Sequence, residues 1–310
     1  MDHISYNKIE ENASKWSNNY KKIKKWCVCE KVHGSNFSFI WNKQNEELKY
    51  ASRTFFIKDN DNFFNYKSIL EVTNPKIYKI VELLLNKNKD INQVIVFGEL
   101  FGGIYPKQNN NNMFDSNYLP VQKGVYYSPN IHFIAFDINI IVNNDKPKYL
   151  DFLESMEYFK QVDLLYTEPL AIFDNYEKAS QYKLGFNSTI PKKLGLYELK
   201  VNKAEGVVIR SLGDENNRYI VKNKIPEFAE SEYYDNTINT NDKKLIGLKM
   251  ITDNRLNNAI SKIGLLDEYR YQIYEMVCQD IINELDIKDN SEKKQLRIYL
   301  MKEIENKFNI

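Results

Sequence analysis

The apolar pattern changes once along this chain, and that change limits the folds available to it more than any other feature. Over residues 26–224, short apolar or alternating runs, such as residues 37–41 and 94–97, are separated by clusters of Asn, Asp, Gly and Lys. Strands joined by turns have this pattern. Two other stretches, residues 67–86 and 151–165, have a spacing closer to that of helices. We therefore expect a mixed α/β or α+β domain here.

The chain beyond residue 234 has a different pattern. Residues 235–244, with the sequence DNTINTNDKK, contain almost nothing to bury and are predicted to form a linker. Two helical patterns follow. One covers residues 244–263 and is closed by Gly264, and the other covers residues 266–285.

A third C-terminal helix is predicted to begin with Asn290 or Ser291 as its N-cap. Its apolar residues recur at every fourth position and form one stripe typical of core packing, namely Leu296, Leu300, Ile304 and Phe308. These patterns predict one domain over residues 1–235 and a small all-helical C-terminal domain over residues 245–310.

Charge and composition exclude several classes of protein. With 43% hydrophobic and 14% aromatic residues, the chain is too apolar to be disordered. Because 43 Lys and Arg stand against 42 Asp and Glu, any surface that attracts nucleic acid must be local. One basic run of this kind, which equally suits a solvated surface, consists of Lys21, Lys22, Lys24 and Lys25. We expect no membrane span, because no stretch of about 18 apolar residues is present.

The cysteines indicate a reducing compartment. Cys27, Cys29 and Cys278 leave no even disulfide framework, and the first residues lack a secretory signal, so a cytoplasmic location is expected. A zinc site formed by these cysteines and His33 is disfavoured, because the Cys-x-Cys pair lacks a second close pair of ligands.

The strongest local signal is the octapeptide EKVHGSNF at residues 30–37, directly after an apolar run. A lysine at the end of a strand and before a glycine turn has its amine held at a cleft. Lys31 therefore suits a nucleophile, although such an amine attacks only in its neutral form and needs surroundings that favour proton loss. By itself, the Lys-x-x-Gly spacing favours a turn with a solvated lysine.

Two carboxylates stand beside apolar runs, and two lysines stand on one probable strand where, taken alone, a solvated face is the simpler interpretation. Glu99 lies in the apolar run VFGELFGG, where an unpaired buried carboxylate would cost several kcal/mol. Glu205 similarly precedes the apolar residues 206–209. Lys222 and Lys224 are two positions apart, so on a strand both side chains point to the same face.

Six elements, in order, resemble the motifs of covalent nucleotidyltransferases in the form found in the RNA ligase 2 family. That family includes phage RNA-repair ligases and trypanosome RNA-editing ligases. The first element is EKVHGSNF, in which His33 stands where DNA ligases and capping enzymes usually carry Asp. The others lie at residues 52–54, 96–103, 133–137, 205–208 and 221–224. The resemblance implies an α+β, ATP-grasp-like nucleotidyltransferase domain of antiparallel sheets with flanking helices, followed by the helical C-terminal domain.

The resemblance also assigns roles to single residues. It implies that Lys31 carries AMP and that Lys222 and Lys224 contact the α-phosphate. Glu205 is expected beside a Mg²⁺ or Mn²⁺ ion and the reacting phosphate, and Asp137 is a second candidate metal ligand. His33 is expected to orient the lysine turn or to act in the RNA-dependent steps. The other expected nucleotide contacts are the backbone of Glu30 and Val32, Asn36, Arg53, Glu99 at the ribose hydroxyls, and Phe136 under the adenine.

The implied activity is ATP-dependent joining of RNA 3′-hydroxyl and 5′-phosphate ends. It proceeds through lysyl-AMP on Lys31 and an adenylylated RNA 5′ end. The expected role is RNA repair or nick sealing. The protein is expected to be a monomer that acts on a nicked duplex. Two alternatives remain open. One is a capping-type guanylyltransferase or a DNA ligase, which His33 and the helical tail disfavour. The other is a catalytically silent RNA-binding relative, which the intact motifs disfavour.

Overall fold

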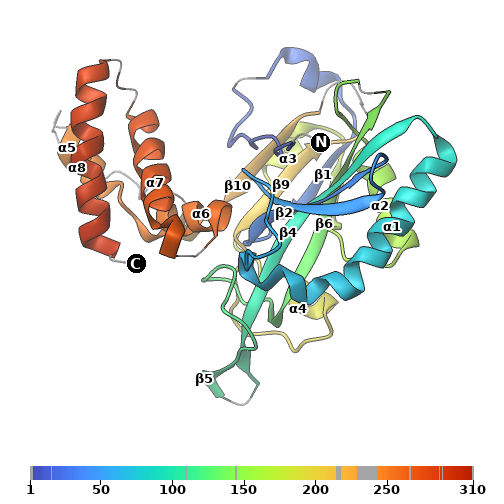
Figure 1. Ribbon diagram of the computed structural model, residues 1–310, viewed down its shortest axis with the longest axis horizontal. Helices are drawn as coiled ribbons and strands as arrows, with labels where there is room; N and C mark the ends of the chain where they lie inside the picture. The colour runs from blue at the N-terminus through green and yellow to red at the C-terminus, as the bar shows by residue number, and fades with distance from the viewer. Residues whose placement is uncertain are drawn as a thin grey trace. The chain divides into compact units, whose positions relative to one another are not determined.

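The computed structural model describes residues 3–14, 16–108, 110–143, 145–213, 218–228, 243–264, 267–285, 287 and 289–308 (Figure 1). The chain divides into two compact units, Met1–Ile225 and Pro226–Ile310. The first contains two antiparallel sheets and the second contains helices, so the predicted α+β class is confirmed. The linker predicted at residues 235–244 lies almost wholly outside the described residues, because residues 229–242 are not described. The predicted boundary between residues 235 and 245 therefore stays a prediction.

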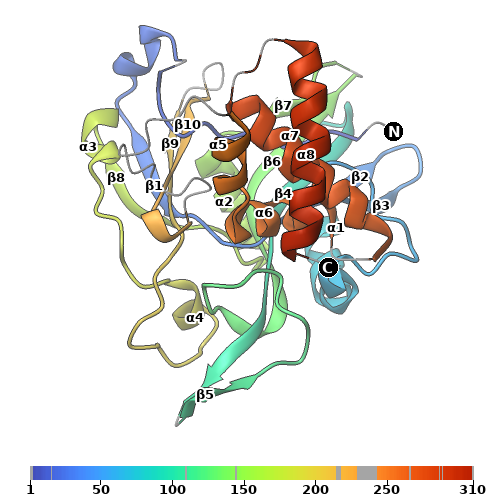
Figure 2. The ribbon, with the colours of Figure 1, turned by 90° about the vertical axis from the view of Figure 1, so that its left-hand side faces the viewer.

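The larger sheet has the strand order β3-β2-β4-β6-β7, with β5 paired to β4. Its strands are β2 (Ser35–Asn42), β3 (Glu47–Ser52), β4 (Ile91–Lys107), β5 (Asn110–Asp115), β6 (Ser128–Val142) and β7 (Lys148–Tyr149). Strand β4 is central and is buried over most of its length, as its apolar sequence predicts. The β4–β5 hairpin extends beyond the other strands (Figure 2).

Helices α1 (Leu70–Lys87) and α2 (Phe152–Gln161) pack against β4 and β6. They correspond to the two helices predicted at residues 67–86 and 151–165. The 3₁₀ helix η2 (Phe63–Ile69) leads directly into α1. The side chain of Asp151 accepts a hydrogen bond from the N–H of Leu153 and so caps α2.

The smaller sheet has the order β10-β9-β1-β8. Its strands are β1 (Trp26–Glu30), β8 (Pro169–Phe173), β9 (Gly206–Ser211) and β10 (Ile220–Lys224). Helix α3 (Tyr176–Ser180) packs against β1 and β8, while α4 (Ile190–Lys193) and the 3₁₀ helix η1 (Asn18–Lys22) complete the unit. One face of β1 carries Trp26 and Val28 into an apolar core, so the other face carries Cys27 and Cys29.

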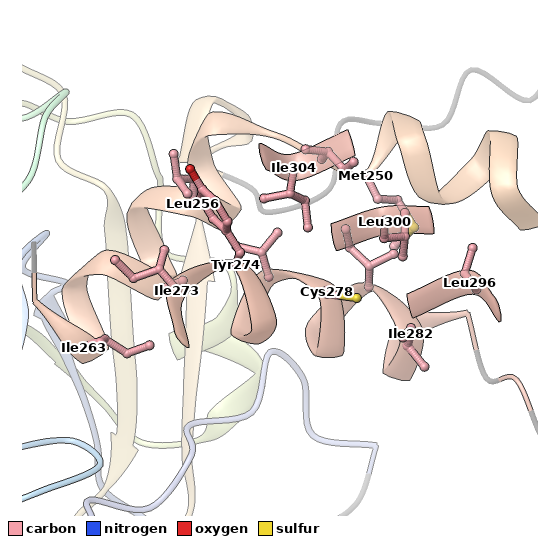
Figure 3. Packing of buried hydrophobic residues seen from close by; sticks show 14 of the residues in the cluster. Met250, Leu256, Ile263, Ile273, Tyr274, Cys278, Ile282, Leu296, Leu300 and Ile304 are labelled. Atoms are coloured by element: carbon pink, nitrogen blue, oxygen red, sulfur yellow. The ribbon is translucent and has the colours of Figure 1, made fainter. Parts of the chain in front are cut away.

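The second unit contains α5 (Lys243–Lys249), α6 (Asp253–Ile263), α7 (Arg270–Glu284) and α8 (Asn290–Phe308), with 3₁₀ helices η3 (Pro226–Phe228) and η4 (Asp267–Tyr269). Its helices share one apolar core (Figure 3). The stripe predicted on α8 is confirmed, since Leu296, Leu300 and Ile304 are buried and Phe308 packs against the same core.

Two details of these helices differ from prediction. The single helix predicted at residues 244–263 is divided into α5 and α6, because the hydroxyl of Thr252 accepts a bond from the N–H of Arg255 and starts a new helix. Asp289, rather than Asn290 or Ser291, accepts a bond from the N–H of Glu292 at the start of α8. Among the described residues, no helix combines the length and the apolar character needed to cross a bilayer.

Candidate active site

Lys31 follows the last residue of β1, and its backbone extends the pairing of that strand. Its N–H donates to the carbonyl oxygen of Gly206 at 2.9 Å. The Lys31 Nζ lies 2.7 Å from Oε2 of Glu205, the residue that directly precedes β9. A Cβ at Gly206 would lie only 2.0 Å from the carbonyl oxygen of Asn223, so the close approach of β10 requires glycine at this position.

Glu205 is a buried carboxylate surrounded by basic side chains. Lys31 and the Nδ1 of His33, at 3.2 Å, both meet its Oε2, and the Lys224 Nζ lies 3.3 Å from its Oε1. Burial by itself favours the neutral acid, but Lys31, His33 and Lys224 together outweigh it and hold the pKa of Glu205 well below its usual value. Glu205 is therefore ionised and organises three basic side chains around one point.

The turn after Lys31 is held from several sides. The backbone N–H of His33 donates to the Tyr127 hydroxyl oxygen at 2.9 Å, and the His33 Nε2 lies 3.0 Å from the carbonyl oxygen of Lys123. A Cβ on Gly34 would lie 2.1 Å from the carbonyl oxygen of Leu100 and 2.8 Å from Cγ of Glu99. The glycine of the motif is therefore needed because the turn packs directly on β4.

Glu99 lies on β4, opposite Asn36 of β2 in the sheet register. Burial is the main reason why the pKa of Glu99 is raised to about 7. The positive charge of Lys31 lowers this pKa, and the negative charge of Glu205 raises it further. The side chain of Asn36 donates to the carbonyl oxygen of Gly98 at 3.4 Å. The apolar run thus contains one partly exposed carboxyl group whose charge interacts with both Lys31 and Arg53.

Lys222 and Lys224 share a face of β10, as their spacing predicts, but they meet different groups. Lys224 contacts Glu205, whereas the Lys222 Nζ lies 3.5 Å from Oε1 of Glu11. The backbone of Lys222 also donates to the carbonyl oxygen of Glu10 at 2.9 Å. The N-terminal segment therefore runs beside β10.

The same N-terminal segment reaches the larger sheet. The Arg53 guanidinium donates to the carbonyl oxygens of Tyr6 and Asn7, at 3.5 and 3.2 Å. The ring of Tyr6 meets that of Phe136 edge to face, with centroids 4.9 Å apart. Two residues expected at the nucleotide, Arg53 and Phe136, are thus both positioned by Tyr6.

The structure gives Asp137 a different place from the one expected. Its Oδ1 accepts from Arg210 at 3.0 Å, and its Oδ2 accepts from the Tyr6 hydroxyl at 2.5 Å and from Arg218. With 1% exposure and both oxygens bound by donors, Asp137 is the centre of a buried ion network. The metal-binding role expected for Asp137 does not fit this arrangement, because its oxygens already neutralise two guanidinium groups.

Comparison with known proteins identifies the family. Residues 24–224 match the model of the RNA ligase family, and residues 247–309 match that of the T4 RNA ligase 2 C-terminal family. The chain belongs to the RNA ligase family. These matches confirm the resemblance to the RNA ligase 2 family that the sequence predicted.

Two relatives of this RNA ligase family member come from Trypanosoma brucei brucei. The chain is 31% identical over 237 residues to mitochondrial RNA-editing ligase 1 of Trypanosoma brucei brucei, a match that covers 67% of this chain and 50% of the relative. It is 32% identical over 200 residues to mitochondrial RNA-editing ligase 2 of the same organism, a match that covers 60% of this chain and 48% of the relative. The chain thus spans about half the length of the curated relatives that it matches.

Solved structures of Naegleria gruberi RNA ligase are also similar. A mutant with ATP and Mn has a TM-score of 0.47 at 15% identity, covering 71% of this chain and 56% of that one. Another mutant, with AMP and Mn, has a TM-score of 0.48 at 15% identity, and the match covers 73% of this chain and 57% of that one.

In this RNA ligase family member, the side chain of Glu30 is turned toward the segment before α4. Its Oε2 accepts from the N–H and the hydroxyl of Thr189, at 2.8 and 2.7 Å, and burial raises its pKa. Val32 is also buried. The backbone contacts with nucleotide expected at Glu30 and Val32 stay predictions.

The described part of the chain contains no group of three or more His, Cys, Asp and Glu side chains suited to holding a metal ion. Cys27 and Cys29 face each other with their sulfurs 3.3 Å apart, while Cys278 belongs to the second unit. Sequence reasoning missed several residues that contact the site, namely Tyr6, Glu11, Lys123, Tyr127, Arg210 and Arg218. Arg210 and Arg218 lie within or near motif segments, but no local pattern distinguishes the others.

Proposed function

We propose that this chain is an ATP-dependent RNA ligase that carries AMP on Lys31 and joins RNA 3′-hydroxyl and 5′-phosphate ends. The observation that carries the proposal is the contact of Lys31 with Glu205 inside a cluster of basic side chains. That cluster lies within the part of the chain that matches the RNA ligase family. Moving an AMP group requires a nucleophilic amine and fixed cations around a phosphate, and this site supplies both.

The proposed reaction has three phosphoryl transfers in one cleft. The Lys31 amine attacks the α-phosphorus of ATP and expels pyrophosphate, which leaves a phosphoramidate. The RNA 5′-phosphate then displaces Lys31 from AMP, and a 3′-hydroxyl finally attacks the adenylylated end and releases AMP. Because phosphoryl transfer depends mainly on position and electrostatics, Lys224 contributes positive charge beside the reacting phosphate, and His33 helps to position the lysine turn.

A divalent ion is proposed to arrive with the phosphates of ATP. Mg²⁺ is commonly bound by one or two carboxylates together with substrate phosphates, and Glu99 and Glu205 are the carboxylates beside Lys31. The ion would neutralise phosphate charge. Glu205 already meets three basic groups, so its main contribution is to hold Lys31, His33 and Lys224 in place.

RNA binding is proposed to involve two other parts of the chain. Lys21, Lys22, Lys24 and Lys25 are all exposed and are suited to meet phosphates. The helical region that matches the T4 RNA ligase 2 C-terminal family is proposed to engage a nicked duplex during sealing by a monomer. A chain that ends at Asn236 is therefore expected to form the AMP adduct but to seal poorly, and full sealing by that fragment would contradict this role.

The test is strand joining with a 5′-labelled RNA nick opposite an RNA complement, in the presence of ATP and Mg²⁺. Sealing by the wild-type protein, and none by Lys31→Ala, would support the proposal. Replacement of ATP by GTP tests the capping alternative, and DNA strands test the DNA ligase alternative. A folded protein that forms no adduct and seals no strand would favour the catalytically silent RNA-binding relative.

A further inference from the structure

A short segment that the motifs do not include contacts the Lys31 turn at two points. Residues 121–127, called here the 121–127 segment, lead into β6. The hydroxyl oxygen of Tyr127 accepts from the backbone N–H of His33 at 2.9 Å, and the carbonyl oxygen of Lys123 lies 3.0 Å from the His33 Nε2. Both the backbone and the ring of His33 are therefore fixed by one segment.

Tyr127 is positioned rigidly for this contact. It is 1% exposed, and its ring meets Phe101 of β4 edge to face with centroids 5.1 Å apart. Burial raises the pKa of Tyr127 well above its usual value, and the charge of the nearby Glu30 carboxylate raises it further. The phenol therefore stays neutral. A phenylalanine would fill the same space, but the N–H of His33 would lose its acceptor.

The 121–127 segment is also attached to the chain that leads to Glu205. The side chain of Asn202 accepts from the N–H of Tyr126 at 2.9 Å and donates to its carbonyl oxygen at 2.7 Å. Asn202 is buried and lies three residues before Glu205. At its other end, the N–H of Val121 donates to the carbonyl oxygen of Gly102 on β4 at 3.0 Å.

The segment thus links the three parts of the chain that carry the candidate site: the Lys31 turn, the approach to Glu205, and β4. We infer that Tyr127 is a positioning residue for the formation of lysyl-AMP. It acts through the backbone N–H of His33 and thereby holds the imidazole against Glu205. This inference rests on the proposed function.

The test is Tyr127→Phe, with Tyr126→Phe as the matched control. Tyr126 is the preceding residue, half-buried, with its ring against Phe114 rather than the Lys31 turn. The rate of lysyl-AMP formation at saturating ATP is expected to fall about tenfold in Tyr127→Phe, or about 1.4 kcal/mol in the barrier. The KM for ATP should stay within about twofold, because the hydroxyl of Tyr127 binds the backbone of His33, which is not among the expected nucleotide contacts. Tyr126→Phe should match the wild-type protein.

The same change in a His33→Ala background separates positioning from a general loss of structure. If Tyr127 acts by placing the imidazole, Tyr127→Phe should add little to the loss already caused by His33→Ala. An equal fractional loss in both backgrounds, an effect on KM alone, an equal loss in Tyr126→Phe, or an unchanged rate would overturn the inference.

A second readout does not depend on activity. The chain has three histidines, so the ring signals of His33 can be assigned by NMR with a single His33→Ala spectrum. Those signals should shift in Tyr127→Phe and stay unchanged in Tyr126→Phe; unchanged signals in both would overturn the inference. A wild-type protein without adduct would contradict the proposed function instead, and the NMR comparison would still decide whether Tyr127 positions His33.

Discussion

The Nζ of Lys31 lies 2.7 Å from a carboxylate oxygen of Glu205, although 174 positions separate the two residues in the sequence. Because β1 and β9 are paired, the end of one strand meets the start of the other. Glu205 thereby holds the proposed nucleophile at a fixed point, beside two further basic side chains. A chain with a net charge of only +1 thus gathers several basic side chains at one point, which suits the proposed phosphate site.

Replacement of Glu205 by Gln should nearly abolish adduct formation. The amide keeps the shape of the side chain but removes the negative charge that Lys31, His33 and Lys224 share. We expect the rate of lysyl-AMP formation to fall at least about 100-fold. The matched control is Glu198→Gln, which alters an exposed carboxylate 3.6 Å from Lys192 and should leave the rate unchanged. A rate within about threefold of wild type for Glu205→Gln would show that this charge is not needed.

Gly34→Ala should separate the Lys31 turn from β4. The added Cβ would clash with the carbonyl oxygen of Leu100 and with the side chain of Glu99, at 2.1 and 2.8 Å, and backbone must shift to admit it. Adduct formation is expected to fall by about tenfold or more. Gly185→Ala provides the comparison, since a Cβ there meets nothing within 4 Å, and its cost of about 1 kcal/mol comes only from the positive φ. Equal activity of the two variants would be evidence against close packing at Gly34.

Asp137→Asn should lower the stability of the first unit by about 3–5 kcal/mol, because it leaves two guanidinium groups without a compensating charge. Asp174→Asn serves as the comparison, since Asp174 pairs with Lys178 on an exposed surface and its replacement should lower the stability much less. Urea denaturation of both variants measures the difference. A loss at Asp137 no larger than at Asp174 would contradict a structural role for the buried network.

The raised pKa of Glu99 predicts a dependence of stability on pH. A carboxyl group that binds its proton more tightly in the folded state contributes stability that is fully present below its unfolded value of 4.5. That stability is lost as pH rises through the folded pKa of about 7. As pH rises from 4.5 to about 7, the free energy of unfolding of the wild-type protein should therefore decrease, while that of Glu99→Gln should not show this decrease. The expected difference is about 1–2 kcal/mol, because solvent at the partly exposed Glu99 weakens the effect. Parallel pH profiles for the two proteins would mean that Glu99 has an ordinary pKa.

The fold class was predictable because hydrophobic periodicity reports which face of an element is buried. The run VFGELFGG became part of central β4, and the four-residue stripe on α8 became core. The division between α5 and α6 was not predictable from periodicity, since it depends on the single cap at Thr252. Tertiary packing, rather than the local pattern, decides such interruptions.

The candidate site was predictable in its residue types and not in its contacts. Motif order and spacing singled out Lys31, Glu205 and Lys224, which the structure brings together. Tyr6 and Tyr127 carry no local signal, because their partners Asp137 and His33 lie 131 and 94 positions away. The same long-range contacts explain why Asp137 resembled a metal ligand in the sequence yet lies between two arginines in the fold.

The most direct test of the central claim is incubation of the purified protein with Mg²⁺ and ATP labelled at the α-phosphate, compared with Lys31→Ala. Lys43→Ala is the control, because the Lys43 side chain donates to the backbone carbonyl oxygen of Lys89 in an exposed turn. The account predicts acid-labile label on the wild-type and Lys43→Ala proteins and none on Lys31→Ala. Undiminished label on Lys31→Ala, or no label on folded wild-type protein with either Mg²⁺ or Mn²⁺, would contradict the assignment of Lys31 as the residue that carries AMP.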